Sequence, residues 1–159
     1  MRRLSPCICE QTDIASVSAK AAAALLRGAR GNSGVILSLI FRGISNGFKG
    51  MDSADGRALA KALELGKESA YKAVMKPTEG TILTVIRMAA EAVKNTQETD
   101  CKAVLKTAYE AAKDALLKTP EMLPVLKQAG VVDAGGQGFI FILEGMLSVI
   151  EDGKTVEPI

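Results

Sequence analysis

The sequence contains no histidine and no tryptophan. Without an imidazole group, these 159 residues hold no Ser-His-Asp triad, no Cys-His dyad and no histidine-supported zinc site. Four phenylalanines and two tyrosines are too few for a platform that stacks single-stranded nucleic acid. The 20 basic and 18 acidic residues are interspersed and leave a net charge of only +2. We therefore expect no nucleic-acid partner.

Cysteine is also scarce. Cys7, Cys9 and Cys101 are an odd number and do not make a disulfide framework. Cys7 and Cys9 are either two thiols in a loose tail or part of a soft-metal site, which would need further ligands. No apolar segment of about 7–15 residues follows the N-terminal arginines, so a secretory leader is not expected. These features favour a reducing, cytoplasmic location.

Long hydrophobic runs are absent too. The longest one, residues 139–150, contains Glu144 and Gly145 and is shorter than the ~18 residues that a membrane-spanning helix needs. We therefore expect no membrane span. With 48% hydrophobic and 24% charged residues, the chain can bury a core, and its length suits one domain.

Alanine-rich segments with apolar residues at helical spacing fill most of the chain, and the alternation typical of strands is not seen. They predict six long helices and one short helix. The expected helices begin after Thr12 or Asp13, after Asn32 or Ser33, after Ser53 or Asp55, after Thr78, after Asp100, at Pro120 following Thr119, and after Asp133. Ends are expected near Gly28 or Gly31 for the first helix, near Phe48 for the second, at Pro77 for the third, near Gln128 for the short one and near Glu151 for the last.

Brief turns favour antiparallel neighbours, so the predicted fold is an all-α, up-and-down helical bundle. We expect a helical domain over residues 12–152, an N-terminal tail over residues 1–11 and a C-terminal tail over residues 153–159. The last helix is apolar almost all round. This predicts that it lies at the centre of the bundle or faces a partner.

The first of three unusual turns, residues 28–34, has three glycines in seven residues and leads directly into a helix. Glycine lets the backbone approach a ligand closely, and the free N–H groups of a helix start attract anions. Asn32 and Ser33 add side-chain donors, and Arg30 adds a positive charge. A phosphate suits such a turn, although the P-loop order is absent. A tight corner between two helices, with Ser33 as an ordinary N-cap, explains the same residues.

The second turn, residues 76–81, combines a glycine with two threonines at another helix start, and simple capping by Thr78 explains it as well. The third turn, residues 130–138, opens an apolar helix with three glycines, each of which costs ~1 kcal/mol relative to alanine. Either a second helix or a ligand must approach closely there, and Asp133 can both cap the helix and contact a ligand. Together the turns indicate a nucleotide pocket at one end of the bundle.

Three stretches of the sequence resemble one family. Residues 28–38 with 41–43, residues 70–85, and residues 130–138 with 143–145 resemble, in order and pattern, the motifs of the DAK2 domain, also called DhaL. The pattern is that of the ATP-binding subunit of bacterial fatty acid kinase, a relative of dihydroxyacetone (glycerone) kinase. The resemblance covers about residues 12–152. It implies an eight-helix antiparallel barrel that holds ATP and Mg²⁺ at one end and serves phosphoryl transfer to an acceptor presented by another domain or protein.

The resemblance also implies a set of site residues. It places Gly31, Asn32, Ser33 and Gly34 at the phosphates, and Thr81, Asp133 and Gly135 in the nucleotide pocket, and it assigns no catalytic residue. Family members carry two earlier helices, joined by an Asp-Gly-Asp-Thr-Gly-Thr-Asn-type loop whose aspartates bind magnesium. That loop does not occur in this sequence. We therefore expect a fold truncated from eight helices, with the Mg²⁺ ligands missing, that binds Mg-ATP poorly and transfers no phosphate alone.

Two classes of function stay open at this point. One is an ATP-binding kinase domain that is incompetent alone, and the other is a non-catalytic helical module for assembly or partner binding. A fragment of a longer protein is a third interpretation of the missing helices. Because their absence would expose a broad apolar face, we also expect a homo-oligomer whose open sides cover each other.

Overall fold

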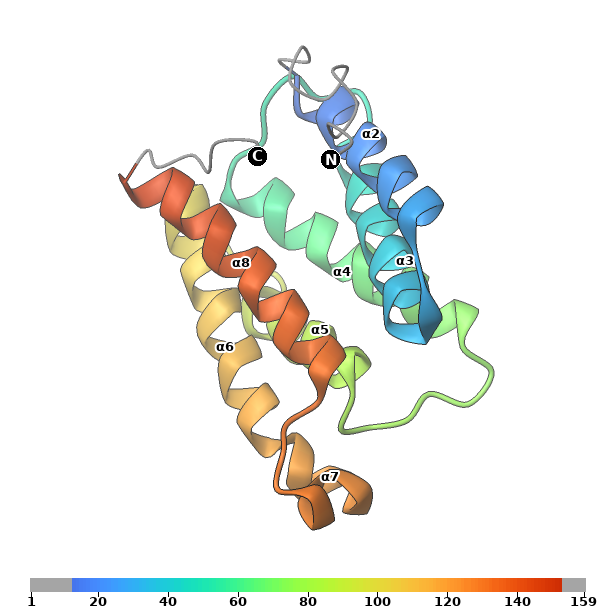
Figure 1. Cartoon of the computed structure of the whole chain (residues 1–159). Coiled ribbons are helices and arrows are strands. Elements are labelled where there is room, and N and C mark those ends of the chain that lie inside the picture. Colours follow the sequence, from blue (N-terminus) through green and yellow to red (C-terminus); the bar gives the residue numbers. More distant parts are fainter. Residues whose placement is uncertain (1–12, 153–159) are drawn as a thin grey trace.

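The computed structural model describes residues 13–152, and within this range the chain forms helices and turns without a strand. The helices are α2 (Ile14–Gly28), α3 (Gly31–Gly47), α4 (Gly56–Ala73), α5 (Ile82–Val93), α6 (Cys101–Met122), α7 (Pro124–Ala129) and α8 (Ala134–Asp152). Six of them are long and α7 is short, and the long helices run up and down the bundle as predicted (Figure 1). The expected tails, with Cys7 and Cys9, lie outside the described residues.

Three helix starts follow the sequence closely. The carboxylates of Asp13, Asp55 and Asp100 each accept a backbone N–H from the first turn of α2, α4 and α6, at 2.9, 2.9 and 3.1 Å. These hydrogen bonds are the main reason that the pKa values of Asp13 and Asp55 lie below the ordinary value. The predicted N-caps at these three helices are confirmed.

Two other starts differ from the prediction. Helix α3 begins at Gly31 with Arg30 as its N-cap, so neither Asn32 nor Ser33 caps it. Helix α5 begins after Thr81 and not after Thr78, because the left-handed backbone of Gly80 (φ +85°) interrupts helical geometry between the two threonines.

The positions of two prolines were also interpreted wrongly. Pro120 does not open the short helix, because α6 continues through it to Met122 and α7 begins only at Pro124. The Thr119 hydroxyl donates to the Leu116 carbonyl at 2.7 Å, the group that the proline leaves without a helical N–H. Helix α4 ends at Ala73, four positions before Pro77, and its C-cap Val74 already has an extended backbone (φ −105°, ψ 118°).

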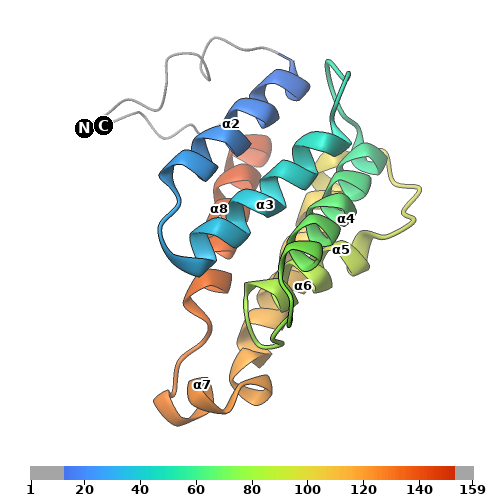
Figure 2. The ribbon, with the colours of Figure 1, turned by 90° about the vertical axis from the view of Figure 1, so that its right-hand side faces the viewer.

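Helices α3 and α4 pack with their backbones almost in contact. A Cβ built on Gly43 would overlap the carbonyl oxygen of Leu65, and one built on Gly66 would lie 2.9 Å from the carbonyl oxygen of Ile40. Figure 2 shows the two helices side by side. This contact brings the start of α3 and the end of α4 to the same end of the bundle.

The substitution Gly43→Ala is therefore expected to lower the free energy of unfolding by about 1–3 kcal/mol, because the new methyl group has no space between the helices. Chemical denaturation measures the loss. The control is Gly28→Ala, at a position where an added Cβ meets nothing within 4 Å. Equal stability of the two variants would contradict the close packing of α3 on α4.

Helix α8 is half buried, which only partly matches the expectation of a central helix. Phe139, Ile140, Leu143 and Leu147 lie in the core. On its other side, large apolar side chains are exposed to solvent, namely Phe141, Met146, Val149 and Ile150. Among the described helices, α8 alone has the length and apolar composition of a membrane span, which core helices of globular domains share.

Candidate functional site

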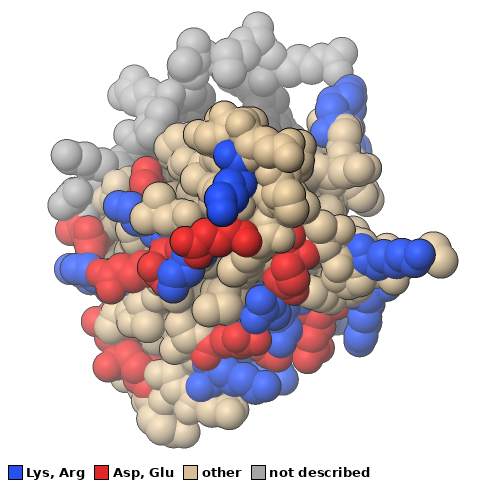
Figure 3. Space-filling view, turned by 90° about the horizontal axis from the view of Figure 1, so that it is seen from below, with Lys and Arg blue, Asp and Glu red and all other residues tan. Residues whose placement is uncertain are grey.

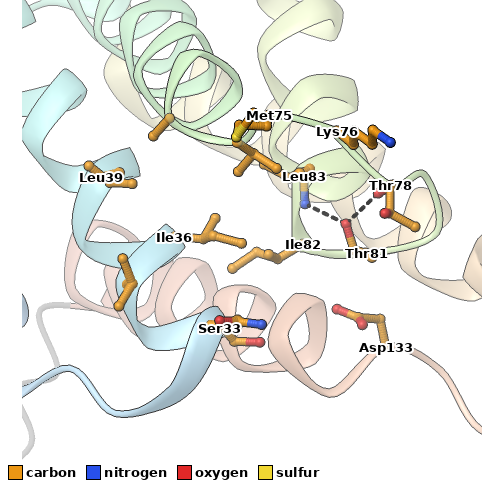
Figure 4. Close-up of a pocket in the computed structure, with 14 residues that line it drawn as sticks. Ser33, Ile36, Leu39, Met75, Lys76, Thr78, Thr81, Ile82, Leu83 and Asp133 are labelled. Carbon is orange, nitrogen blue, oxygen red and sulfur yellow. Dashed lines mark hydrogen bonds between the residues drawn. The ribbon is translucent and has the colours of Figure 1, made fainter.

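A cavity of about 530 Å³ lies where the first turns of α3 and α5, the N-cap of α8 and the loop after α4 come together (Figure 4). Its size is in the range of small-molecule sites. Polar and charged side chains line one part of it, namely Asn32, Ser33, Lys76, Thr78, Thr81 and Asp133. Apolar residues form the rest, namely Val35, Ile36, Leu39, Ala73, Val74, Met75, Ile82 and Leu83.

The four predicted site residues with polar side chains all line this one cavity. Asn32 and Ser33 reach it from α3, Thr81 from the start of α5 and Asp133 from the start of α8. They come from three turns that are widely separated in the sequence. The fold therefore brings the three turns together at one cavity.

The three predicted glycines do not line the cavity, but two of them permit its shape. Gly31 has a left-handed backbone (φ +70°) at the start of α3. A Cβ on Gly135 would lie 2.7 Å from the Ser33 hydroxyl, so a larger residue there would push α3 and α8 apart. Gly34 contacts only Ala29, at an ordinary 3.5 Å from an added Cβ.

Helix α3 presents an open N-terminus to this cavity. Its N-cap, Arg30, makes no capping hydrogen bond with its side chain and donates instead to the Ala29 carbonyl at 2.9 Å. The neighbouring helix starts are capped, since Thr81 accepts the Leu83 N–H at 3.3 Å and Asp133 accepts the Gly136 N–H at 2.8 Å. The first N–H groups of α3 are thus the ones available to an anion, and the helix dipole adds to their attraction.

Asp133 is the carboxylate of the cavity. Its Oδ2 accepts the Gly136 N–H, and Figure 4 shows the carboxylate turned toward the cavity. Its own backbone N–H donates to the hydroxyl of Thr119 at 3.1 Å. Hydrogen bonds therefore hold both the backbone and the carboxylate of Asp133. The carboxylate faces the cavity that the first turn of α3 also lines.

A polar network that the sequence did not reveal holds the loop between α4 and α5. The Glu79 carboxylate accepts hydrogen bonds from Tyr71 at 3.3 Å, from Arg87 at 3.1 Å and from Thr84. Burial raises the pKa of Glu79, but the hydrogen bonds from Thr84 and Arg87 outweigh it and hold this pKa below the ordinary value. Burial raises the pKa of Tyr71. The network fixes the loop that carries Thr78 and Thr81, whose hydroxyl donates to the Thr78 carbonyl at 2.7 Å.

Charges of both signs surround this end of the molecule. Seen from below, lysines and arginines alternate with aspartates and glutamates, and no large area of one sign forms on the face in view (Figure 3).

The described residues do not form a magnesium site by themselves. Asp133 is the only carboxylate that lines the cavity, and no group of three or more Asp, Glu, Cys or His side chains comes together within residues 13–152. Magnesium sites in proteins usually take one or two carboxylates together with phosphate oxygens and water. Within residues 13–152, the cavity thus offers one carboxylate to a Mg²⁺ ion.

Comparison with known proteins identifies the family. The family model of the DAK2 domain matches residues 2–148. Protein YloV of Bacillus subtilis is 47% identical over 146 residues, which are 91% of this chain and 26% of that protein. Uncharacterized proteins of Staphylococcus saprophyticus and Staphylococcus haemolyticus are 46% and 47% identical over 134 and 135 residues.

The chain spans about a quarter of the length of these curated relatives, 24–26%, whereas the aligned part covers 83–91% of the chain itself. The similarity therefore concerns one domain of longer proteins. Its range includes all three glycine-containing turns and the residues that line the cavity. The chain belongs to the DAK2 domain family.

Proposed function

We propose that the cavity binds ATP and that the domain serves phosphoryl transfer to an acceptor presented by another domain or protein. The family relates the chain to dihydroxyacetone and fatty acid kinases and implies nucleotide binding in general. The observation that carries the proposal is the open N-terminus of α3, which lies in one cavity with two further helix starts. Uncapped N–H groups at a helix start are a common phosphate site.

In this proposal the phosphates lie at Gly31, Asn32, Ser33 and Gly34, and Thr81 and Asp133 complete the polar part of the pocket. The apolar wall, which includes Ile36, Leu39 and Ile82, suits the flat and largely apolar base. Gly135 lies next to the site, and its lack of a side chain lets α8 approach Ser33. A reaction that uses ATP also agrees with the cytoplasmic location that the cysteine content favours.

The chain alone is proposed to bind nucleotide without transferring phosphate. Phosphoryl transfer relies on cations that neutralise the β- and γ-phosphates, and the cavity offers a single carboxylate to hold them. Further carboxylates must come from residues outside the described range or from another chain. The alternative function is a non-catalytic helical module, in which the glycines only let helices pack.

Calorimetric titration of ATP and of AMP into the purified chain, with and without Mg²⁺, separates these two functions. We expect ATP to bind with a dissociation constant on the order of 100 μM and AMP more weakly, since AMP lacks the distal phosphates. We also expect little gain from Mg²⁺, because Asp133 is the only carboxylate there. No binding of either nucleotide under both conditions would contradict the proposed function and favour the helical module.

We further propose that a second copy of the chain covers the open side between α2 and α8. Both helices border the same side of the molecule, and among the described helices α2 packs on α3 but does not contact α8 (Figures 1 and 2). Helix α2 carries Lys20 and Arg27 and no acidic residue, whereas α8 carries acidic residues and no basic one. An added Cβ on Gly138 or Gly145 of α8 meets nothing within 4 Å, which leaves room for a closely packed helix.

Sedimentation at micromolar concentration is expected to show a dimer that dissociates as salt is raised, because opposite charges on α2 and α8 contribute to it. Phe141→Lys, at a side chain that is 61% exposed on α8, should give a monomer. Val125→Lys is the matched control, because Val125 is also 61% exposed but lies on α7. A wild-type chain that sediments as a monomer at these concentrations would contradict the proposal.

A further inference from the structure

One fully buried hydroxyl links α6 to the start of α8. Thr119 is 0% exposed and lies one residue before the proline inside α6. Its hydroxyl donates to the Leu116 carbonyl at 2.7 Å and accepts the backbone N–H of Asp133 at 3.1 Å. The second bond joins residues that are 14 positions apart, so it belongs to the tertiary structure.

The proline determines the direction of this hydrogen-bond chain. In a regular helix, the N–H of residue 120 would donate to the carbonyl of Leu116, but Pro120 has no N–H. The Thr119 hydroxyl donates there instead and commits its only proton. The lone pairs of that oxygen can still accept a hydrogen bond, and the Asp133 N–H donates to them. The hydroxyl oxygen of Thr119 is thus held at a fixed place, where it accepts the N–H of Asp133, the residue that caps α8.

The same turn of α6 also supports the loop that carries Thr81. A Cβ on Gly80 would lie 3.1 Å from the Thr119 carbonyl oxygen and 2.9 Å from Cβ of Leu123, so the loop packs directly on this turn. Gly136 of α8 is equally close, with an added Cβ 3.0 Å from a methyl group of Leu116. Residues 116–123 therefore contact two of the segments that contribute polar side chains to the cavity.

We propose that Thr119 is a positioning residue for the cavity: it holds the backbone of Asp133, and with it the start of α8 against Ser33, in the arrangement that nucleotide binding requires. The inference rests on the proposed nucleotide site. Thr119 itself does not line the cavity, so it acts through Asp133 and does not touch the ligand. Its hydroxyl, rather than its volume, is the part that matters.

The test compares Thr119→Val with Thr119→Ser. Valine keeps the shape of threonine and loses the hydroxyl, whereas serine keeps the hydroxyl. Thr119→Val should weaken ATP binding about 5- to 10-fold and speed amide hydrogen exchange at Asp133, because its N–H loses its acceptor. Thr119→Ser should stay within about twofold of the wild type in both measurements.

A stability control separates positioning from general weakening. Ile140→Val removes one buried methyl group from α8 without touching the hydrogen-bond chain. It should destabilise the domain and leave both the ATP affinity and the Asp133 exchange rate relative to other α8 amides unchanged. Wild-type affinity and wild-type Asp133 exchange in Thr119→Val would overturn the inference.

Two results are kept distinct by the exchange measurement. If the wild-type chain does not bind ATP, the proposed function fails. The hydrogen bond from the Asp133 N–H to Thr119 is still tested, because it predicts slow exchange of the Asp133 amide in the wild type and fast exchange in Thr119→Val. If Thr119→Val does not fold, amide hydrogen exchange of the wild-type chain alone tests the inference. Exchange of the Asp133 amide at the rate of a free amide would then overturn the inference, and strong protection supports it.

Discussion

The substitution Asn32→Asp is expected to weaken ATP binding by about 30-fold or more while leaving the domain as stable as the wild type. The two side chains have the same shape, so the change adds one negative charge and almost nothing else. Asn32 lines the cavity from the first turn of α3, beside the uncapped N–H groups that are proposed to hold the phosphates. A carboxylate there repels the phosphates and competes with them for the same donors.

The effect on stability should have the opposite sign. A negative charge in the first turn of a helix is favourable by about 0.3–1 kcal/mol, because it interacts with the positive end of the helix dipole. Helix α3 has no acidic residue in its first turn and no side-chain cap, so it stands to gain from one. Thermal denaturation should therefore show an unchanged or slightly higher midpoint for Asn32→Asp, and a loss of affinity could not be attributed to unfolding.

Calorimetry at low and moderate salt completes this experiment. The loss of affinity should shrink as salt is added, since ions screen the repulsion between exposed charges. Asn46→Asp is the matched control, because Asn46 is an exposed asparagine of the same helix near its other end. Equal ATP affinities of Asn32→Asp and the wild type would show that the start of α3 does not hold the phosphates.

The sequence predicted the helices best where their caps are local. Asp13, Asp55 and Asp100 bond N–H groups two or three residues ahead, so the cap and its partner lie in the same short stretch. The start of α5, which was predicted wrongly, depends on a distant contact. The left-handed conformation of Gly80 packs on Leu123 and on the Thr119 carbonyl, some 40 positions further along the chain.

Four of the six polar and charged residues that line the cavity could be predicted, but its apolar half could not. Glycine-containing turns are recognisable in a sequence, and together with the family resemblance they gave Asn32, Ser33, Thr81 and Asp133. Ile36 and Ile82 have the helical spacing of core residues, and nothing local distinguishes a side chain that faces a cavity from one that faces a neighbouring helix. Val74 and Met75 were assigned to the last turn of a helix, whereas α4 ends before them.

The Glu79 network shows the same limit. Tyr71 and Arg87 lie eight positions before and eight positions after Glu79, on two different helices, and only the antiparallel packing of α4 and α5 brings both to its carboxylate. A lone acidic residue in a turn carries no sign of such partners. The network matters for the site because it fixes the loop on which Thr78 and Thr81 lie.

The reverse exchange at the opposite wall, Asp133→Asn, should strengthen ATP binding about 5- to 10-fold when no Mg²⁺ is present. It removes the single carboxylate of the cavity, which opposes the phosphates in the absence of a cation. Asparagine is as good an N-cap as aspartate, so the hydrogen bond to the Gly136 N–H can persist and the stability should change by less than about 1 kcal/mol.

Asp133→Asn and Asn32→Asp thus make the same chemical exchange in opposite directions on two walls of one cavity. If charge controls binding, their effects on affinity have opposite signs, and the double variant should bind metal-free ATP more tightly than Asn32→Asp alone. Calorimetry of all four proteins gives the complete cycle. Weaker metal-free binding by Asp133→Asn would contradict this argument, because it would mean that the carboxylate accepts a hydrogen bond from the nucleotide rather than repelling it.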